Sequence, residues 1–456
     1  MAKYQKYAEY KDSGVEWLGE IPNDWEMWKL SHAYTEIGSG TTPSTSNEEN
    51  FEGNIPWVTT GELRENLILD TKKNVSQRTI QQFPTLKKYP IGSVAIAMYG
   101  ATIGRLGIFG IEATTNQACC VMTTSKVLNN KYVFYWLQAF KNEIIQLSSG
   151  GGQPNINQEK VASLKISAPF FEDQINIANF LDHETAQIDT LIAKQEKLIE
   201  LLKEKRQAVI SHAVTKGLNP DVNMKDSGVE WLGQVPEHWD VIAISKVTQK
   251  ITNGYVGPTR DILVEEGIPY VQATHIKKGK VNFDNAYFVR EKWSNDHAKS
   301  ILKKDDVLIV QTGAGTGDVG LVSESEEGFN CHALIILQPK KQQLSGSYLA
   351  YCLQSDYGYA TLYSIRTGGM HPHLNCGEVQ FVKISVPPLD EQVAISKFIE
   401  KNIQDFDQLI EKAKLAIQLM QERRTALISS AVTGKIDVRH HASHPSGNDK
   451  KQKEGI

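Results

Sequence analysis

Disulfide bonds, export signals and membrane spans find no support in this sequence. Its 456 residues include five cysteines, Cys119, Cys120, Cys331, Cys352 and Cys376, an odd number with no C-x-x-C pair. That usage favours reduced cytosolic thiols over a disulfide framework or a zinc site. No stretch approaches the roughly 18 consecutive apolar residues of a membrane helix, and the first residues lack the apolar core of a signal peptide. We therefore expect a cytoplasmic protein with no membrane partner.

An excess of positive charge is also missing. The formal net charge is −4 at pH 7, so the chain carries no global basic signal for nucleic acid. A local basic patch remains compatible with that total, because net charge averages over all faces. A hydrophobic content of 40% and a charged content of 22% describe an ordinary globular chain. The length predicts two to four domains.

The motifs of common enzyme classes are absent as well. The sequence has no G-x-x-x-x-G-K-S/T phosphate loop and no H-E-x-x-H zinc motif. It also lacks an N-P-P or D-P-P run followed by an aromatic residue, which amino-methyltransferases use to hold the target nitrogen. We therefore expect no catalysis by this chain alone and no cofactor bound by it.

Proline and glycine are missing from two long stretches, and these stretches organise the chain. Gln174–Thr215 contains neither residue over 42 positions, which predicts one helix roughly 60 Å long. Such a helix is too long to be covered by one small domain, so we expect a second helix against it. Apolar residues at heptad spacing predict the seam: Leu181, Ile188, Leu191, Leu198, Leu202 and Val209.

The chain supplies the second helix itself. The stretch recurs without a gap 218 residues later, at Gln392–Thr433. Identical residues include surface positions, such as Asp189 and Asp407, so we favour two helices that pair with each other over two unrelated amphipathic helices. The corresponding seam positions are Ile399, Phe406, Leu409, Ala416, Met420 and Leu427.

A short motif near the N-terminus is duplicated too. Lys11–Gly19, with the sequence KDSGVEWLG, recurs letter for letter as Lys225–Gly233. The whole chain is therefore a tandem duplication. Each copy runs from this motif through a variable globular segment into a long helix.

The globular segments predict a mixed α+β class. Short runs rich in β-branched residues, such as 55–58 and 94–97 in the first copy and 268–271 and 307–310 in the second, read as strands. Helix-like runs lie near 132–147 and 347–363. The predicted boundaries are an N-terminal segment 1–25, a globule 26–168, a long helix 169–216, a linker 217–239, a globule 240–386, a long helix 387–434 and a disordered tail 435–456.

Two features imitate functional sites. Gly315–Gly320 fits the dinucleotide pattern G-x-G-x-x-G, but no helix period follows it and the other copy has Thr102 at the first glycine. We therefore expect a tight turn between strands. His440, His441 and His444 lie in the polar tail with no fourth ligand at metal-site spacing, so we expect no metal site.

The loops of the globules have a chemistry suited to DNA. Small polar loops can bring backbone amides and hydroxyls to phosphates, lysine clusters supply charge, and Arg, Gln, Asn and His can read base edges. For each residue alone, solvated surface is the simpler explanation, so the prediction depends on the architecture. The candidate DNA-binding residues are Ser39, Thr41, Thr42, Lys72, Lys73, Arg105, Gln117, Gln153, Asn155, Tyr255, Arg260, Gln272, His275, Lys277, Lys278, Arg366 and His371.

Together these motifs resemble one known family. KDSGVEWLGEIPNDW precedes a globule whose strand ends in a glycine turn. P-x-x-x-[DE]-Q then opens a helix that closes with R-x-A-[VL]-I-S-x-A-V-T-[KG], and the order occurs twice. This arrangement is similar to that of the specificity subunit of type I restriction-modification systems, and the similarity covers nearly the whole chain apart from the tail.

The resemblance implies a fold and a function. Each globule would be a target recognition domain that reads one half of a split, asymmetric DNA site. The two long helices would pack as an antiparallel coiled coil with pseudo-twofold symmetry. Two methyltransferase subunits would dock on this scaffold, carry S-adenosylmethionine and methylate adenine N6. Two restriction subunits would add ATP- and Mg-dependent cleavage, while this chain reads double-stranded DNA without catalysis.

Two other functions stay open from the residues alone. One is an enzyme with an active site that no motif reveals, for which methyl transfer by the isolated chain would be the sign. The other is a scaffold that binds only proteins, for which the assembled complex would lack specific DNA binding.

Overall fold

The computed structural model describes residues 4–147, 155–284, 286–368 and 373–439. The chain divides into two compact units, and we describe each by itself. Unit 1 comprises Met1–Lys194 and Ala416–Ile456, and unit 2 comprises Gln195–Leu415. Each unit therefore combines one globule with parts of both long helices.

Unit 1 is built around a five-stranded mixed sheet with the order β4-β11-β8-β9-β6. Its strands are β4 (Ile37–Ser39), β6 (Asn66–Ile68), β8 (Val94–Ala97), β9 (Leu106–Phe109) and β11 (Cys119–Met122). All pairings are antiparallel except that of β6 with β9. A smaller sheet has the order β10-β5-β7, with β5 (Ile55–Val58), β7 (Asn74–Val75) and β10 (Thr114–Thr115).

The remaining elements of unit 1 are short. Two two-stranded ladders join β1 (Tyr10–Asp12) to β2 (Glu20–Pro22), and β3 (Glu26–Lys29) to β12 (Lys165–Ala168). The short helices are α1 (Leu30–Ala33), α2 (Gln77–Gln82), α3 (Asn130–Ala139), α4 (Lys141–Gln146) and α5 (Gln158–Ser163). The helix-like run near 132–147 is thus two helices, because the chain breaks at Phe140.

Unit 2 repeats this plan with a six-stranded sheet, β16-β25-β22-β23-β20-β19, and a second sheet, β17-β21-β18-β24. The first contains β16 (Thr248–Asn253), β19 (Ile276–Lys277), β20 (Gly279–Val281), β22 (Val307–Val310), β23 (Val319–Leu321) and β25 (Leu334–Pro339). The second contains β17 (Leu263–Val264), β18 (Ile268–Val271), β21 (Phe288–Val289) and β24 (Asn330–Cys331). The ladders are β13 (Met224–Asp226) with β14 (Gln234–Pro236), and β15 (Asp240–Ala243) with β26 (Lys383–Val386). The short helices are α7 (Ile244–Val247), α8 (Glu291–Asp296), α9 (Gly346–Gln354), α10 (Asp356–Ser364) and α11 (Cys376–Val379).

The two long helices are confirmed. α6 spans Phe171–Lys216 and α12 spans Leu389–Val432. Each starts shortly after a proline step with acidic residues in its first turn, which suits the positive end of a helix dipole. α6 is followed by Gly217 (φ +77°) and α12 by Gly434 (φ +69°). A left-handed glycine just past the last turn is a common helix stop, because it carries no Cβ to clash.

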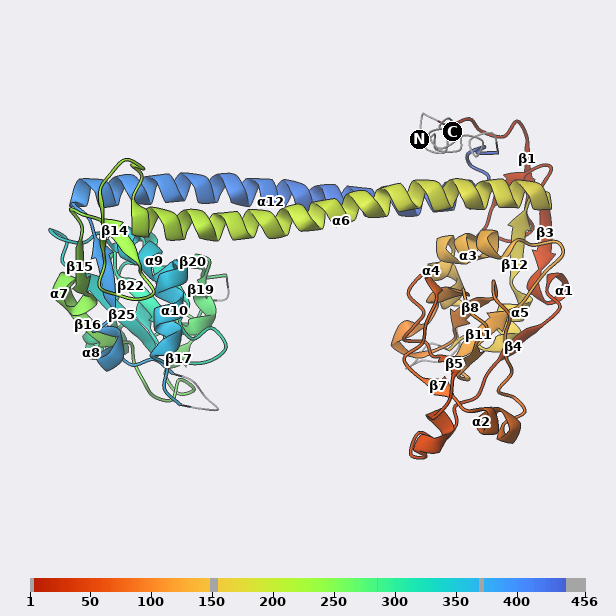
Figure 1. Cartoon of the computed structure of the whole chain (residues 1–456), viewed down its shortest axis with the longest axis horizontal. Coiled ribbons are helices and arrows are strands. Elements are labelled where there is room, and N and C mark those ends of the chain that lie inside the picture. Colours follow the sequence, from red (N-terminus) through yellow and green to blue (C-terminus); the bar gives the residue numbers. More distant parts are fainter. Residues whose placement is uncertain (1–3, 148–154, 285, 369–372, 440–456) are drawn as a thin grey trace, which may run out of the picture. The chain divides into compact units, whose positions relative to one another are not determined.

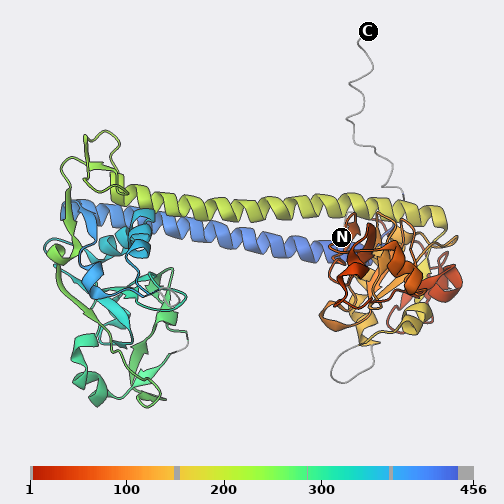
Figure 2. The same ribbon diagram turned by 60° about the horizontal axis from the view of Figure 1, so that its bottom comes forward.

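Within each unit the helices run antiparallel side by side (Figure 1). In unit 1 the first half of α6 meets the last part of α12, and in unit 2 the last half of α6 meets the first part of α12. Figure 2 shows the two helices adjacent in a second view of unit 2. The predicted antiparallel coiled coil is therefore present.

The seam differs in detail from the prediction. Leu191, Leu198 and Leu409 are 49%, 42% and 47% exposed, so placing them in the seam was wrong. Each is followed by an isoleucine that turns inward instead, and a heptad pattern with two adjacent apolar residues cannot tell which one faces the partner. The inward positions are Ile188, Ile192, Gln195, Ile199, Leu202, Phe406, Ile410, Ala413, Ile417 and Met420. Among the other predicted seam positions, Leu181, Ile399 and Leu427 are buried, and Val209 and Ala416 are half-buried.

Buried polar side chains tie each globule to the helices in the same way. In unit 1 the Tyr132 hydroxyl donates to the carbonyls of Ser167 (2.8 Å) and Val432 (3.2 Å). In unit 2 the Tyr348 hydroxyl donates to the carbonyls of Ser385 (3.1 Å) and Val214 (3.3 Å). These bonds satisfy carbonyls in the last turn of each long helix, which have no partner inside the helix.

The tail begins later than predicted. Ile436 and Val438 are buried in the core of unit 1, and the amide of Asp437 donates to the carbonyl of Gln5 at 2.8 Å. Arg439 forms ion pairs with Asp437 at 2.7 Å and with two further carboxylates of unit 1. A disordered tail from residue 435 is therefore wrong for 435–439, because two apolar side chains there gain by burial. Residues 440–456, including the predicted histidine cluster, lie outside the described residues.

Candidate nucleic-acid interface

Two loops meet beside the main sheet of unit 1. The first follows β8 and begins at Tyr99, and the second ends at Asn155. Tyr99 and Asn155 form an antiparallel bridge, and the amide of Ile156 donates to the carbonyl of Met98 at 2.8 Å. Asn155 is exposed at this junction, which places its amide where a bound molecule could reach it.

Unit 2 builds the same junction. Thr312, after β22, bridges His373, and the amide of Leu374 donates to the carbonyl of Gln311 at 2.9 Å. Thr367 also pairs with His373 through both backbone directions, at 3.0 and 2.8 Å. The junction is therefore a property of the duplicated fold, while the residues that line it differ between the copies.

The glycine run after β22 is a turn between strands, as predicted. The amide of Thr316 donates to the carbonyl of Gly313 at 3.1 Å, and that of Gly317 returns to Val310 at 2.9 Å. The chain then enters β23 directly, so no helix N-terminus is present there to hold a phosphate. Partial burial raises the pKa of the Asp318 carboxyl in this turn.

A third loop joins the junction of unit 1. The Ser39 hydroxyl donates to Oε1 of Gln158 at 3.3 Å, and the amide of Thr41 donates to the carbonyl of Thr115 at 3.1 Å. Thr42 donates through its hydroxyl to Oε1 of Gln117. The structure therefore gathers the predicted residues Ser39, Thr41, Thr42 and Gln117 in one polar patch.

The equivalent loop of unit 2 carries an aromatic cluster. The Tyr255 ring lies 5.0 Å from those of Trp293 and His297 in edge-on contacts. Next to it, burial lowers the pKa of His332, which therefore favours the neutral form. Arg260, farther along this loop, is exposed. Tyr255 is thus half-committed to packing, whereas Arg260 is free for a partner.

Several predicted residues lie apart from these junctions or are committed elsewhere. His275 is 3% exposed and its Nδ1 accepts the amide of Gln272 at 2.9 Å, so its proposed base contact is wrong. The Lys73 ammonium lies 4.9 Å above the Phe51 ring, and Lys72 is exposed beside it. Gln153 and His371 lie outside the described residues. Of the others, Arg105 is half-buried after the first glycine turn, Gln272 is half-buried, and Lys277 and Lys278 occupy the β19–β20 hairpin.

Sequence reasoning missed how the loops meet. Tyr99 and Gln158 were not chosen, although both contact predicted residues. The available signal was the constant spacing in both copies, since Tyr99 to Asn155 and Thr312 to His373 join equivalent turns. Arg366 was chosen, and its guanidinium lies 3.8 Å above the Tyr363 ring.

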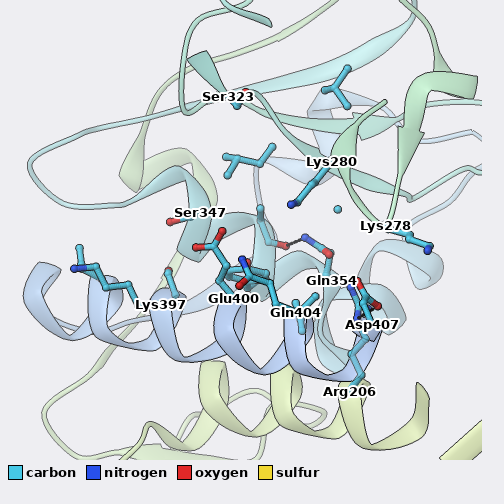
Figure 3. A pocket seen from close by; sticks show the side chains of 18 of the residues that line it. Arg206, Lys278, Lys280, Ser323, Ser347, Gln354, Lys397, Glu400, Gln404 and Asp407 are labelled. Carbon is cyan, nitrogen blue, oxygen red and sulfur yellow. Dashed lines mark hydrogen bonds and ion pairs between the residues drawn. The ribbon is translucent and has the colours of Figure 1, made fainter. Parts of the chain in front are cut away.

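The largest cavity described in unit 2, about 560 Å³, lies between α9, α12 and β20. Figure 3 shows Lys280 reaching toward Gln354, and Arg206 of α6 beneath Asp407 of α12. Unit 1 has a smaller cavity of about 300 Å³ at the equivalent place. There Lys131 pairs with Asp182 at 2.6 Å, whereas Ser347 stands at the position of Lys131 in unit 2.

No catalytic or metal centre emerges from the residues that the structure describes. Within those ranges, no three His, Cys, Asp or Glu side chains gather as metal ligands would. All five cysteines are free thiols, and burial raises the pKa of Cys120 and Cys352 to about 12, which keeps them from acting as thiolates. No helix in the same ranges combines the length and apolar character needed to cross a bilayer.

Comparison with known proteins agrees with this architecture. The model of the type I restriction modification DNA specificity domain matches residues 22–201 and again 236–419. The chain is 23% identical to the MjaVIII specificity subunit of Methanocaldococcus jannaschii over 92% of this chain and 95% of that protein. It is also 24% identical to the MjaIX specificity subunit of the same organism, over 96% and 99%.

Solved structures show the same fold. A chain from a structure of a type I R-M system superposes with a TM-score of 0.71 at 15% identity, covering 91% of this chain and 99% of that one. The HsdS subunit from Thermoanaerobacter tengcongensis gives 0.54 at 15% identity, over 91% and 98%. The duplicated domain match, the paired long helices and the two loop junctions lead to one conclusion: the chain belongs to the family of type I restriction-modification specificity subunits, which recognise DNA and are not themselves catalysts.

Proposed function

We propose that this chain reads a bipartite, asymmetric DNA site, with residues 26–168 reading one half and residues 240–386 the other. The observation that carries the proposal is the recurrence of one loop junction, Tyr99 with Asn155 and Thr312 with His373. A repeated scaffold that presents different side chains suits two half-sites of different sequence, as paired readers in dimeric repressors suit equal ones.

The contact residues follow from the same junctions. In the first reader they are Ser39, Thr41, Thr42, Gln117 and Asn155, with Arg105, Lys72 and Lys73 at its margins. In the second they are Tyr255, Arg260, Gln272, Lys277, Lys278 and Arg366. Hydroxyls, amides and lysines fix the protein on phosphates, whereas Arg, Gln and Asn supply the bidentate contacts that distinguish bases.

Two copies of a methyltransferase subunit are the proposed partners. Exposed leucines support this part, because they recur in pairs under the 218-residue shift: Leu191 with Leu409, and Leu201 with Leu419. Each unit therefore presents one leucine from α6 and one from α12, so two equivalent surfaces await the same partner. Apolar side chains that a helix leaves exposed favour a protein contact.

The chemistry would then belong to the partners. S-adenosylmethionine would bind the methyltransferase subunits, which methylate adenine N6, and ATP and Mg would bind two restriction subunits. The assembly would act on host and invading DNA in the cytoplasm. This chain would supply DNA recognition alone, since none of its described residues forms a catalytic constellation.

Expression of the chain with and without its methyltransferase partner tests the proposal. In cells that lack other adenine methylation, sequencing of the DNA should show one split, asymmetric motif only when both proteins are present. Purified chain mixed with duplex DNA and labelled S-adenosylmethionine should transfer no methyl group. Transfer by the chain alone would favour an enzyme, and an assembled complex without sequence-specific DNA binding would favour a protein scaffold.

A further inference from the structure

An exposed aromatic row on α10 has no role in the core of unit 2. Tyr359 and Tyr363 are 52% and 61% exposed, and their rings lie 6.3 Å apart. Their i, i+4 spacing places both on one side of the helix. Arg366 extends the row, because its guanidinium lies 3.8 Å above the Tyr363 ring. Two tyrosines and an arginine are thus aligned on the surface without burying one another.

A lysine lies at the other end of the row. Lys278 and Tyr359 line the same cavity of about 200 Å³, together with Gly317 of the glycine turn. Lys278 has φ +51°, a left-handed conformation in which glycine would be unstrained. A strained lysine at a turn indicates that its side chain is used, since the backbone alone would favour a smaller residue.

Unit 1 uses the same positions differently. Glu65 occupies the place of Lys278 with a similar φ of +55°, and its carboxylate pairs with Lys141 at 3.2 Å. Glu143 and Leu147 stand where unit 2 has the two tyrosines, if Tyr132 and Tyr348 are aligned. In the part of unit 2 that the structure describes, neither Lys278 nor Arg366 has a carboxylate within 4.0 Å. The cations of unit 2 are therefore left for an external anion.

We propose that Lys278, Tyr359, Tyr363 and Arg366 form a strip that holds the phosphate backbone of duplex DNA at the second half-site. The inference rests on the proposed DNA-reading function and adds two tyrosines to it. Two cations at the ends match the charge of a phosphate strand, and tyrosine hydroxyls between them are donors that phosphates accept. The strip borders both elements of the loop junction, since Gly317 shares its cavity and Thr367 follows Arg366.

Unit 1 offers no such strip, so the two readers hold DNA unequally. Its equivalent positions carry one paired carboxylate, one further acid and one leucine, which do not attract phosphate. The second reader should therefore contribute a larger share of the salt-dependent, sequence-independent affinity. An acidic protein surface would be the competing occupant, and the experiment separates the two.

Salt-dependent DNA binding tests the strip in the full chain assembled with its methyltransferase partner. The probe is a duplex that carries the methylated motif mapped in cells, with a scrambled duplex beside it. Each lost phosphate contact lowers the slope of log K against log salt by about 0.9. The double variant Lys278→Gln/Arg366→Gln should lower the slope by about 1.8 on both duplexes. The double variant Tyr359→Phe/Tyr363→Phe should weaken binding several-fold and leave the slope unchanged.

Matched controls lie elsewhere in unit 2. Lys383→Gln removes an exposed lysine of β26, and Phe381→Ala removes an exposed aromatic side chain; both should bind DNA as the unaltered chain does. Lys278→Arg/Arg366→Lys keeps the charges and should keep the slope, which separates charge loss from misfolding. An unchanged slope in the glutamine variant, or a loss of methyltransferase assembly in place of DNA affinity, would overturn the strip. If the unaltered complex binds neither duplex, the proposed function itself fails.

Discussion

Arg424 of α12 donates from Nε to Oδ1 of Asp189 of α6 at 3.0 Å, within unit 1. In unit 2 the same pair recurs with the helices exchanged, because Arg206 of α6 faces Asp407 of α12 at 4.0 Å. Both residues of the second pair follow from the first by the 218-residue shift. An exchange of this kind is what a twofold relation between the two helices requires.

Exchanging the charges of the first pair tests its contribution. Arg424→Asp places two carboxylates together and should lower the free energy of unfolding by about 1 kcal/mol, the upper range for a partly exposed pair. Asp189→Arg/Arg424→Asp restores opposite charges and should recover most of that loss. Thermal unfolding at low salt measures both variants. Equal stability of the single and double variants would show that the pair contributes nothing.

The corrected seam predicts opposite effects for neighbouring side chains. Ile188 is 4% exposed, so Ile188→Ala should lower the free energy of unfolding by about 2–4 kcal/mol through lost burial and a cavity. Leu191→Ala removes a side chain that faces outward and should cost less than about 1 kcal/mol. The second variant should instead weaken binding of the methyltransferase subunit. Denaturant unfolding and titration with the partner separate the two effects; a large stability loss for Leu191→Ala would restore the original seam.

Much of this architecture could be predicted from the sequence. The absence of Pro and Gly over 42 residues, and its exact repetition, predicted α6 and α12 almost to their ends. The inward face was harder, because Leu191 and Ile192 are adjacent and equally apolar. Burial of Ile436 and Val438 was also hidden, since two apolar residues in a polar stretch carry no periodic signal.

The candidate interface was predictable only in composition. Glycine-rich polar loops were recognisable, but the bridge between Tyr99 and Asn155 joins turns that are 56 residues apart in the chain. His275 shows the opposite error, since a loop histidine suited to DNA is buried against Phe283 at 4.8 Å. Its burial depends on tertiary packing that no local pattern records.

Lengthening both helices tests whether they set the spacing between half-sites. One heptad inserted after Gln195 and another after Ala413 preserve the seam phase, so pairing should survive. Seven residues add about 10.5 Å to each helix, and at 3.4 Å per base pair that corresponds to about three base pairs. Sequencing of methylated DNA should show both half-sites retained and the unread gap enlarged. An active complex with an unchanged gap would mean that the helices do not set it.

Exchange of one reader tests the central claim most directly. The globule 26–168 is replaced by the corresponding globule of a relative with a different methylation motif, and the hybrid is expressed with its methyltransferase partner. Sequencing of methylated adenines should show one half of the motif replaced by the relative's half, with the other half and the gap retained. A motif that changes in both halves, or in neither, would contradict two independent readers in this chain.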